Sequence, residues 1–297
     1  MKELSPIVVF AYNRPGKLEN LLNILSRDPL ARDSELFIFI DGPKSSADAL
    51  KVDKVYEVAS RAGGFRSVSI TRSDHNKGLG TSIVTGVSAV FEKYDRVIVL
   101  EDDLAPVSCY LTYMNAALER YRDNPAVFSI CGYTNSVPMP KDYQYDAFFC
   151  VRSSSCGWGS WRDRWKTVDW DPSLEDIEKF GSAFNRWGGS DCASMLKSWR
   201  IGRNQSWAIR FCYSQFRQNK VSLFPVKSLV DISASFDEEA TNCHKYSRFK
   251  FELFCPDMEQ FRFPEKVEII PSVRRKFLWY HSIPARAISK IMYMIYG

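Results

Sequence analysis

The chain has 297 residues, of which 45% are hydrophobic, so it can bury a substantial core and does not belong to the disordered class. Five of the 40 basic residues follow Glu268, the last acidic residue, and residues 1–268 therefore hold 35 charges of each sign. A neutral body argues against a nucleic-acid-binding face on the main domain.

Strand-like and helix-like segments alternate up to about residue 131, at the spacing of βαβ units. The expected strands are 7–11, 36–40, 68–71, 96–100 and 127–131, and the expected helices are 16–27, 47–61, 81–93 and 107–122. This order predicts an α/β fold with a mostly parallel sheet and helices on both faces. Because polar loops follow the strands, we expect Arg14, Asp41, Lys77 and the segment 101–103 to converge along one edge.

The strand expected at 96–100 ends in three consecutive carboxylates, Glu101, Asp102 and Asp103. Carboxylates this close repel one another, and a divalent cation with a phosphate is the simplest partner that makes the arrangement favourable. The cluster therefore predicts a metal-assisted phosphate or nucleotide site. The alternative is an acidic turn after a strand.

Beyond residue 131 the pattern changes. Helix-like segments lie at 173–187 and 191–219, and short strand-like segments lie at 222–225 and 229–232. Four of the eight tryptophans fall between residues 158 and 170, and we expect Trp165 and Trp170 to belong to a core. Glycines on both sides of Trp158 predict a turn that leaves its indole free to stack on a sugar.

Eight cysteines are scattered without a C-x-x-C pair or a Cys/His spacing typical of a metal site, so we expect reduced thiols. The apolar stretch at 7–11 is too short for a signal peptide core, and no apolar run approaches the roughly 18 residues that a membrane span needs. These features predict a cytoplasmic protein.

Five motifs, taken in order, resemble those of the nucleotide-sugar-dependent glycosyltransferases of the GT-A fold, specifically bacterial family 2-like proteins related to N-acetylglucosaminyltransferase I. They are Tyr-Asn-Arg-Pro, Ile-Asp-Gly, Asn-Lys-Gly-Leu-Gly, Leu-Glu-Asp-Asp-Leu and Gly-Trp-Gly-Ser-Trp. The resemblance implies a Rossmann-like GT-A domain over 1–245, with a nucleotide-sugar half at 1–131 and a smaller acceptor half at 132–245. Residues 246–297 would form a C-terminal extension with a basic tail.

The resemblance also implies a UDP-sugar donor and a divalent cation, Mn²⁺ or Mg²⁺. Asp103 would be the metal ligand of a variant D-x-D signature, and Glu101 and Asp102 would contact the donor sugar and ribose. Arg14 matches an arginine near the diphosphate, and Asp41 matches the aspartate that selects uridine. Their alternatives are a surface arginine and an ordinary Asp-Gly turn.

Further residues of the donor site follow from the same resemblance. Lys77 would lie near phosphate, while Gly78 and Gly80 would allow close approach of the loop to the donor. Trp158 would contact the sugar, and His244 would lie near the metal. A solvated lysine and a structural histidine are the alternatives for Lys77 and His244.

Inverting members of this family use a carboxylate beside a tryptophan to deprotonate the acceptor hydroxyl. The matching segment here, 204–208, contains no carboxylate. Asp237 and Glu238 are the preferred candidates for this base, and Asp163 and Asp191 are further ones. Either preferred residue could also be plain loop surface.

Residues 272–297 combine five basic residues and no acidic one with many apolar side chains. This composition predicts an interfacial segment on the inner face of the cell membrane, or alternatively a helix packed on the domain. The chain is thus expected to transfer a hexosyl or N-acetylhexosaminyl group to a glycan or lipid-linked acceptor in bacterial surface polysaccharide synthesis. A non-catalytic nucleotide-sugar or glycan-binding module is the alternative. A sugar-1-phosphate nucleotidyltransferase needs a glycine-rich loop where Tyr-Asn-Arg-Pro stands.

Overall fold

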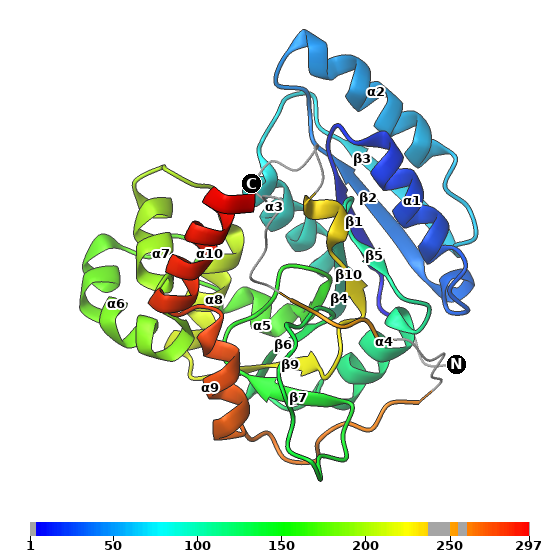
Figure 1. The fold of residues 1–297 in the computed structure, drawn as a ribbon. Helices are drawn as coiled ribbons and strands as arrows, with labels where there is room; N and C mark the ends of the chain where they lie inside the picture. The colour runs from blue at the N-terminus through cyan, green and yellow to red at the C-terminus, as the bar shows by residue number, and fades with distance from the viewer. Residues whose placement is uncertain (1–3, 237–249, 255–259, 297) are drawn as a thin grey trace.

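The structure is a computed structural model that describes residues 4–236, 250–254 and 260–296 (Figure 1). Its main sheet has eight strands in the order β3-β2-β1-β4-β8-β6-β9-β7, and β5 pairs with β10 in a small antiparallel ribbon. The strands are β1 (Ile7–Ala11), β2 (Glu35–Ile40), β3 (Ser67–Arg72), β4 (Arg96–Glu101), β5 (Ala105–Pro106), β6 (Val127–Cys131), β7 (Ala147–Cys150), β8 (Trp158–Trp161), β9 (Val221–Pro225) and β10 (Val230–Asp231).

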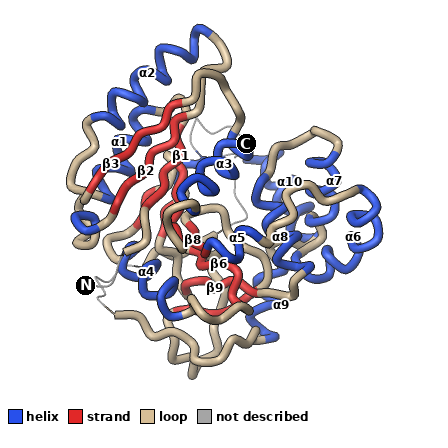
Figure 2. Tube along the Cα trace, turned by 180° about the vertical axis from the view of Figure 1, so that it is seen from behind, coloured by secondary structure: helices blue, strands red, loops and turns tan. Residues whose placement is uncertain are grey.

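Helices cover both faces of the main sheet (Figure 2). The α-helices are α1 (Pro15–Leu25), α2 (Ser46–Ser60), α3 (Leu79–Phe91), α4 (Tyr110–Arg120), α5 (Arg162–Lys166), α6 (Leu174–Gly188), α7 (Cys192–Arg200), α8 (Trp207–Arg217), α9 (Pro271–Trp279) and α10 (Ile283–Tyr296), with 3₁₀ turns η1 (Ala31–Asp33) and η2 (Ser233–Phe236). Strands β7 and β8 run against the other six, so the mostly parallel α/β sheet expected from the sequence is confirmed.

Strand β1 shows why the sheet needs two helical layers. All five of its residues are buried, and alternate side chains point to opposite faces. Ile7 and Val9 pack in one core with α1, α2 and α4, whereas Val8 and Phe10 pack in another with α3 and α8. A strand that is apolar at every position is stable only when both of its faces are covered.

The elements expected before residue 131 lie within a few residues of their observed bounds. The single helix expected over 191–219 is wrong, because the chain forms α7 and α8 with a break between them. Gly202 lies in this break with φ of +75°, a conformation that a continuing helix does not allow. Six of the eight cysteines lie in the described ranges, and all six are free thiols.

The expected Gly-Trp-Gly turn is also wrong, because Trp158–Trp161 form the inner strand β8 between β4 and β6. Gly159 permits this placement, since a Cβ there would meet the Val97 carbonyl oxygen at 2.8 Å. Only a residue without a side chain lets the two strands approach at this point. The sheet therefore continues through both expected halves of the domain.

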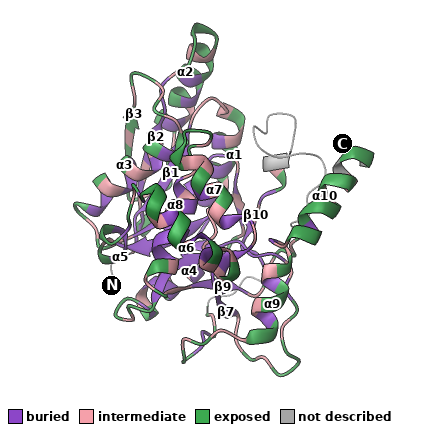
Figure 3. Ribbon diagram, turned by 90° about the vertical axis from the view of Figure 1, so that its left-hand side faces the viewer, coloured by how far each residue is buried: buried purple, intermediate pink, exposed green. Residues whose placement is uncertain are grey.

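The C-terminal tail has two differently packed helices. In α9, Val273 and Phe277 are buried against the β7–β9 end of the sheet, where the rings of Phe224 and Phe277 lie 5.1 Å apart. Figure 3 shows that α10 stands at the edge of the molecule and is largely exposed. Among the described helices, none combines the length and apolar character that crossing a bilayer requires.

Candidate functional site

The registers of β1, β2 and β4 bring the expected donor residues to one edge of the sheet. Ala11 lies opposite Ile40, and Phe10 lies opposite Glu101. The ladder continues one step further, because the backbone amides of Asp41 and Asp102 each donate to a β1 carbonyl at 3.0 Å. The carboxyl ends of the three strands therefore present their next residues side by side.

Arg14 connects the start of α1 to the carboxylates that follow β4. Its Nη2 lies 2.9 Å from Asp102 Oδ1, and its Nη1 lies 3.0 Å from Asp103 Oδ2. The side chains of Asp102 and Asp103 are 3% and 15% exposed, so solvent screens these contacts poorly. The expected convergence of Arg14 with the acidic cluster is confirmed. Its contact with a diphosphate stays a prediction.

Burial raises the pKa of two carboxylates of this cluster. Burial, reinforced by the charges of Asp103 and Asp102, raises the pKa of Glu101 to about 8. Burial also raises the pKa of Asp102 to about 7, although the Arg14 guanidinium opposes the increase. One guanidinium therefore does not compensate for the acidic cluster. A further cation at this edge of the sheet would favour the ionised form of these carboxylates.

The cluster is suited to a cation that brings other ligands with it. No three His, Cys, Asp or Glu side chains within 4–236, 250–254 and 260–296 are grouped to hold a metal ion by themselves. In proteins, Mg²⁺ is commonly bound by one or two carboxylates together with substrate phosphates and water. Asp103 therefore fits such a cation when a diphosphate supplies further oxygens. His244, the other expected ligand, lies outside the described residues.

Asp41 holds the loop that leads into α3. Its buried carboxylate accepts hydrogen bonds from the backbone amides of Gly42 and Lys77 on Oδ1 and of Gly78 on Oδ2, all at 2.9 Å. Asn76 adds a bond from its side-chain nitrogen to the Gly42 carbonyl at 2.9 Å. The loop expected near the donor thus lies at the same sheet edge as the acidic cluster. The Lys77 side chain is exposed.

Gly78 and Gly80 allow another group to come close to the loop backbone, as expected. The group that does so in the structure belongs to the protein itself. A side chain on Gly78 would overlap the Gln205 side chain, and one on Gly80 would overlap the Gln205 backbone oxygen. Gly78 also has φ of +76°, in the region that favours glycine. The segment between α7 and α8 is therefore seated on the start of α3. Gln205 was not among the expected site residues.

A second network that the motifs did not reveal lies beside Arg14. Asp48 accepts bonds from the Tyr12 hydroxyl and the Asn13 side-chain nitrogen, both at 3.0 Å. The same residue sits in the first turn of α2, where the Ser45 side chain accepts from its backbone amide. The spacing Ser45-x-x-Asp48 is typical of a helix N-terminus and was the available signal. The network fixes the loop that carries Arg14.

Cys156 lies near the acidic cluster and was likewise not expected. Burial, together with the charges of Glu101 and Asp103, raises the pKa of its thiol to about 12. The thiol is therefore protonated at neutral pH and is a poor nucleophile. The loop before β8 therefore comes close enough to the acidic cluster for its charges to act on this thiol.

Trp158 is not available to a sugar, which corrects the expectation of a free indole. The side chain is 1% exposed and stacks on Trp165, with ring centres 5.7 Å apart. On another side it packs against Trp207, with ring centres 4.8 Å apart. The flanking glycines serve strand packing instead of exposing the ring. Trp165 is core, as expected, and Trp170 is half-buried against it.

The candidates for the catalytic base divide into two groups. Asp237 and Glu238, the preferred pair, lie outside the described residues. Asp163 is exposed and binds Arg164 with both oxygens, at 2.8 and 2.7 Å. Asp191 is buried and pairs with Arg152 at 2.9 Å. The structure therefore gives Asp163 and Asp191 partners of their own.

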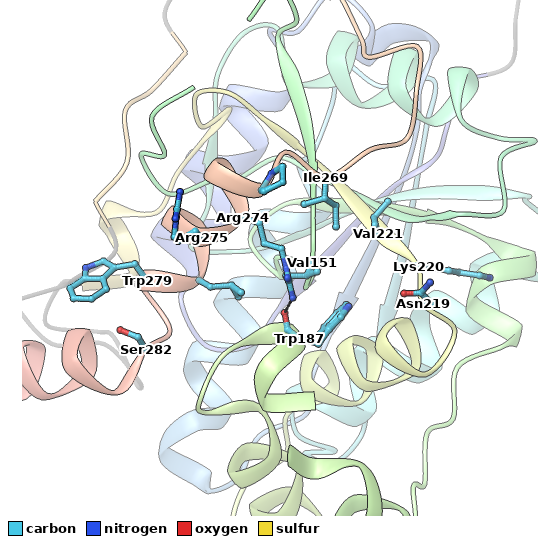
Figure 4. A pocket seen from close by; sticks show the side chains of 12 residues that line it. Val151, Trp187, Asn219, Lys220, Val221, Ile269, Arg274, Arg275, Trp279 and Ser282 are labelled. Carbon is cyan, nitrogen blue, oxygen red and sulfur yellow. Dashed lines mark hydrogen bonds between the residues drawn. The ribbon is translucent and has the colours of Figure 1, made fainter. Parts of the chain in front are cut away.

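A groove of about 720 Å³ lies away from this site, between α9, the end of α6 and the start of β9 (Figure 4). Lys220, Arg274 and Arg275 contribute positive charge, and Trp187 and Trp279 contribute aromatic surface. Because β9 begins at Val221 and runs in the direction of β4, the groove lies at the amino edge of the sheet, opposite the carboxylates. Arg274 also donates to the last carbonyls of α6 at 3.4 Å.

No protein-family model and no curated protein matches the sequence. Among solved structures, the chain is similar to a mannosyltransferase from Pyrobaculum calidifontis in complex with GDP-Man and Mn²⁺. The identity is 13% and the TM-score 0.36, over 55% of this chain and 46% of that one. This chain thus spans less than half of the length of the Pyrobaculum protein.

Two further solved structures are similar to a comparable degree. Glucosyl-3-phosphoglycerate synthase from Mycobacterium tuberculosis, in complex with Mn²⁺, UDP and glucosyl-3-phosphoglycerate, has 14% identity and a TM-score of 0.37, over 60% of this chain and 66% of that one. UDP-glucose pyrophosphorylase complexed with UDP-glucose has 9% identity and a TM-score of 0.40, over 75% of this chain and 90% of that one. Similarities with TM-scores this low carry no argument about function.

Proposed function

We propose that the chain is a glycosyltransferase that moves a hexosyl or N-acetylhexosaminyl group from a UDP-sugar to a glycan or lipid-linked acceptor, with a divalent cation and with inversion. The reaction belongs to bacterial surface polysaccharide synthesis. The proposal rests on the two ion pairs that the Arg14 guanidinium forms with Asp102 and Asp103. These residues lie at the carboxyl edge of the parallel strands, where open α/β sheets bind their ligands. Arginine and a metal-binding carboxylate together are a suitable arrangement for a diphosphate.

The donor is held by residues of three neighbouring strand ends. Arg14 would bind a diphosphate oxygen, and Asp103 would hold Mn²⁺ or Mg²⁺ when the diphosphate is bound. Asp41 uses two of its lone pairs on Oδ1 and one on Oδ2, so Oδ2 retains a lone pair for the N–H of a uracil. Lys77 and Gly78 border the phosphates, while Glu101 and Asp102 contact the sugar and ribose.

In the transfer step, the acceptor oxygen forms a bond to the anomeric carbon while the bond from that carbon to the β-phosphate oxygen breaks. The bonding electrons leave with UDP, and a carboxylate takes the acceptor proton. We assign this carboxylate to Asp237 or Glu238, with His244 near the cation. When bound, the divalent cation supplies charge neutralisation for the departing diphosphate. Arg14 binds the same group and adds a second positive charge.

The test is UDP binding by calorimetry with and without Mn²⁺, in the wild type and in Asp103→Ala. We expect Mn²⁺-dependent binding that becomes more than about tenfold weaker in the variant, because the cation loses its protein ligand. Asp123→Ala is the matched control, since this aspartate is 89% exposed and lies after α4. Equal, Mn²⁺-independent binding by all three proteins would contradict the proposal.

A non-catalytic nucleotide-sugar or glycan-binding module is the second candidate. The lack of a carboxylate in the segment 204–208, where the resembled family carries its base, favours it. Slow release of UDP from a UDP-sugar in the presence of Mn²⁺ separates the two, because a binding module forms the complex without turnover. A panel of UDP-sugars also identifies the donor.

A further inference from the structure

Helix α10 presents a continuous apolar face to solvent. At about 100° per residue, Ile283, Ile288, Ile291, Met294 and Ile295 fall within one side of the helix. These five side chains are between 51% and 69% exposed. Exposure of so many large aliphatic groups on one element is costly in water. The face is therefore suited to a partner.

The opposite side of α10 fixes which way this face points. Ala285 is 8% exposed, and Ser289 and Met292 are half-buried. At the corner between α9 and α10, the Ser190 amide and hydroxyl both donate to the His281 carbonyl, at 3.1 and 2.8 Å. The helix is thus attached to the body by one side, and its apolar face is turned outward (Figure 3).

The charged residues of α9 and α10 are all basic. Arg286 and Lys290 lie on α10 beside the apolar residues, and Arg275 and Lys276 lie exposed on α9. No acidic residue occurs after Glu268. Trp279, which is 52% exposed at the end of α9, adds an amphipathic ring of the kind that favours the membrane interface. A second copy of the tail would bring like charges together, whereas anionic lipid headgroups complement them.

We propose that α10 docks flat on an anionic lipid bilayer, with Ile283, Ile288, Ile291, Met294 and Ile295 among the headgroups and the basic residues against the lipid phosphates. Docking of this kind does not require glycosyl transfer. If the proposed function holds, docking brings the enzyme to a lipid-linked acceptor.

The experiment is flotation of the purified full chain with vesicles, without nucleotide or metal. One set of vesicles contains phosphatidylcholine alone, and the other contains equal parts of phosphatidylcholine and phosphatidylglycerol. We expect binding to the anionic vesicles and binding at least about tenfold weaker to the neutral ones. The double variant Ile288→Glu with Ile291→Glu is expected to lose more than about a hundredfold in affinity for the anionic vesicles.

Leu50→Glu is the matched control, because Leu50 is 70% exposed on α2 and its variant should bind vesicles as the wild type does. Circular dichroism melting verifies that the double variant folds. Equal vesicle binding by the double variant would overturn the proposal. The proposal would also be overturned if the wild-type chain did not bind vesicles but formed a dimer in sedimentation velocity, while the double variant remained a monomer. UDP binding measured on the same samples keeps a failure of docking distinct from a failure of the proposed function.

Discussion

Asp41 illustrates how far single residues of this site could be anticipated. Its position at a strand end followed from the pattern of apolar segments, and so did its proximity to the acidic cluster. Its bonds to the amides of Lys77 and Gly78 could not be anticipated, because they depend on the path of a loop that no periodicity describes. The same holds for Gln205, whose side-chain amide is placed against Gly78 by the break between α7 and α8.

The structural role of Asp41 leads to a stability prediction. In Asp41→Asn, the new NH₂ group faces backbone N–H donors, so at least one buried amide loses its acceptor. We expect the free energy of unfolding to fall by about 1–3 kcal/mol. Urea denaturation measures this change, and hydrogen exchange should show faster exchange at Lys77 and Gly78. Asp74→Asn, at an exposed aspartate nearby, should change neither quantity.

At the scale of elements, the sequence predicted segments whose periodicity is strong and continuous. The β1 and β6 bounds agree with expectation because both segments are buried at every position and, apart from Ser129, consist of hydrophobic residues. Strand β8 was missed because glycine and serine weaken its apolar pattern, although its partners β4 and β6 cover it completely. The burial of Trp158 follows from this strand, so the error in the element produced the error in the residue.

The space around two helix glycines predicts opposite effects of the same substitution. Gly80→Ala should destabilise the protein by about 1–3 kcal/mol, because the new methyl group overlaps the Gln205 backbone oxygen. Gly16→Ala, in α1, has open space around the new atom and should stabilise by about 0.5–1 kcal/mol. Chemical denaturation of both variants measures the two signs. A stabilising Gly80→Ala would contradict the contact.

At the scale of the whole molecule, a buried ion pair connects the segment after β7 to the start of α7. Arg152, in the left-handed region with φ of 65°, pairs with Asp191 at the start of α7, where His281 also lies nearby. Burial would raise the pKa of Asp191, but the charges of Arg152 and His281 outweigh burial and lower it. This pair could not be predicted from the sequence pattern, because its members are 39 residues apart in the chain.

This pair predicts a pH-dependent loss of stability. Since the pKa of Asp191 is lower in the folded chain than its ordinary 3.8, its contribution is complete above that pH and is lost as the pH falls through the folded value. Asp191→Asn should cost roughly 3–5 kcal/mol at pH 7, because it leaves the Arg152 charge buried without a counterion. The difference from the wild type should shrink in acid. Urea denaturation across pH measures it.

The control for this prediction is an exposed ion pair. Asp171, whose side chain is 77% exposed, pairs with Arg200. Asp171→Asn should change the free energy of unfolding by less than about 0.5 kcal/mol at any pH in the same series. A pH-independent difference between Asp191→Asn and the wild type would show that the carboxylate charge is not the source of the stabilisation.

Strand β8 has a mechanical consequence. Its hydrogen bonds to β4 on one side and β6 on the other join the segment that carries the acidic cluster to the segment after residue 131. The two parts therefore cannot rotate apart about a hinge without breaking a ladder at the centre of the sheet. Any rearrangement that admits a substrate is confined to the loops at the carboxyl edge, while the strands beneath them remain a rigid base.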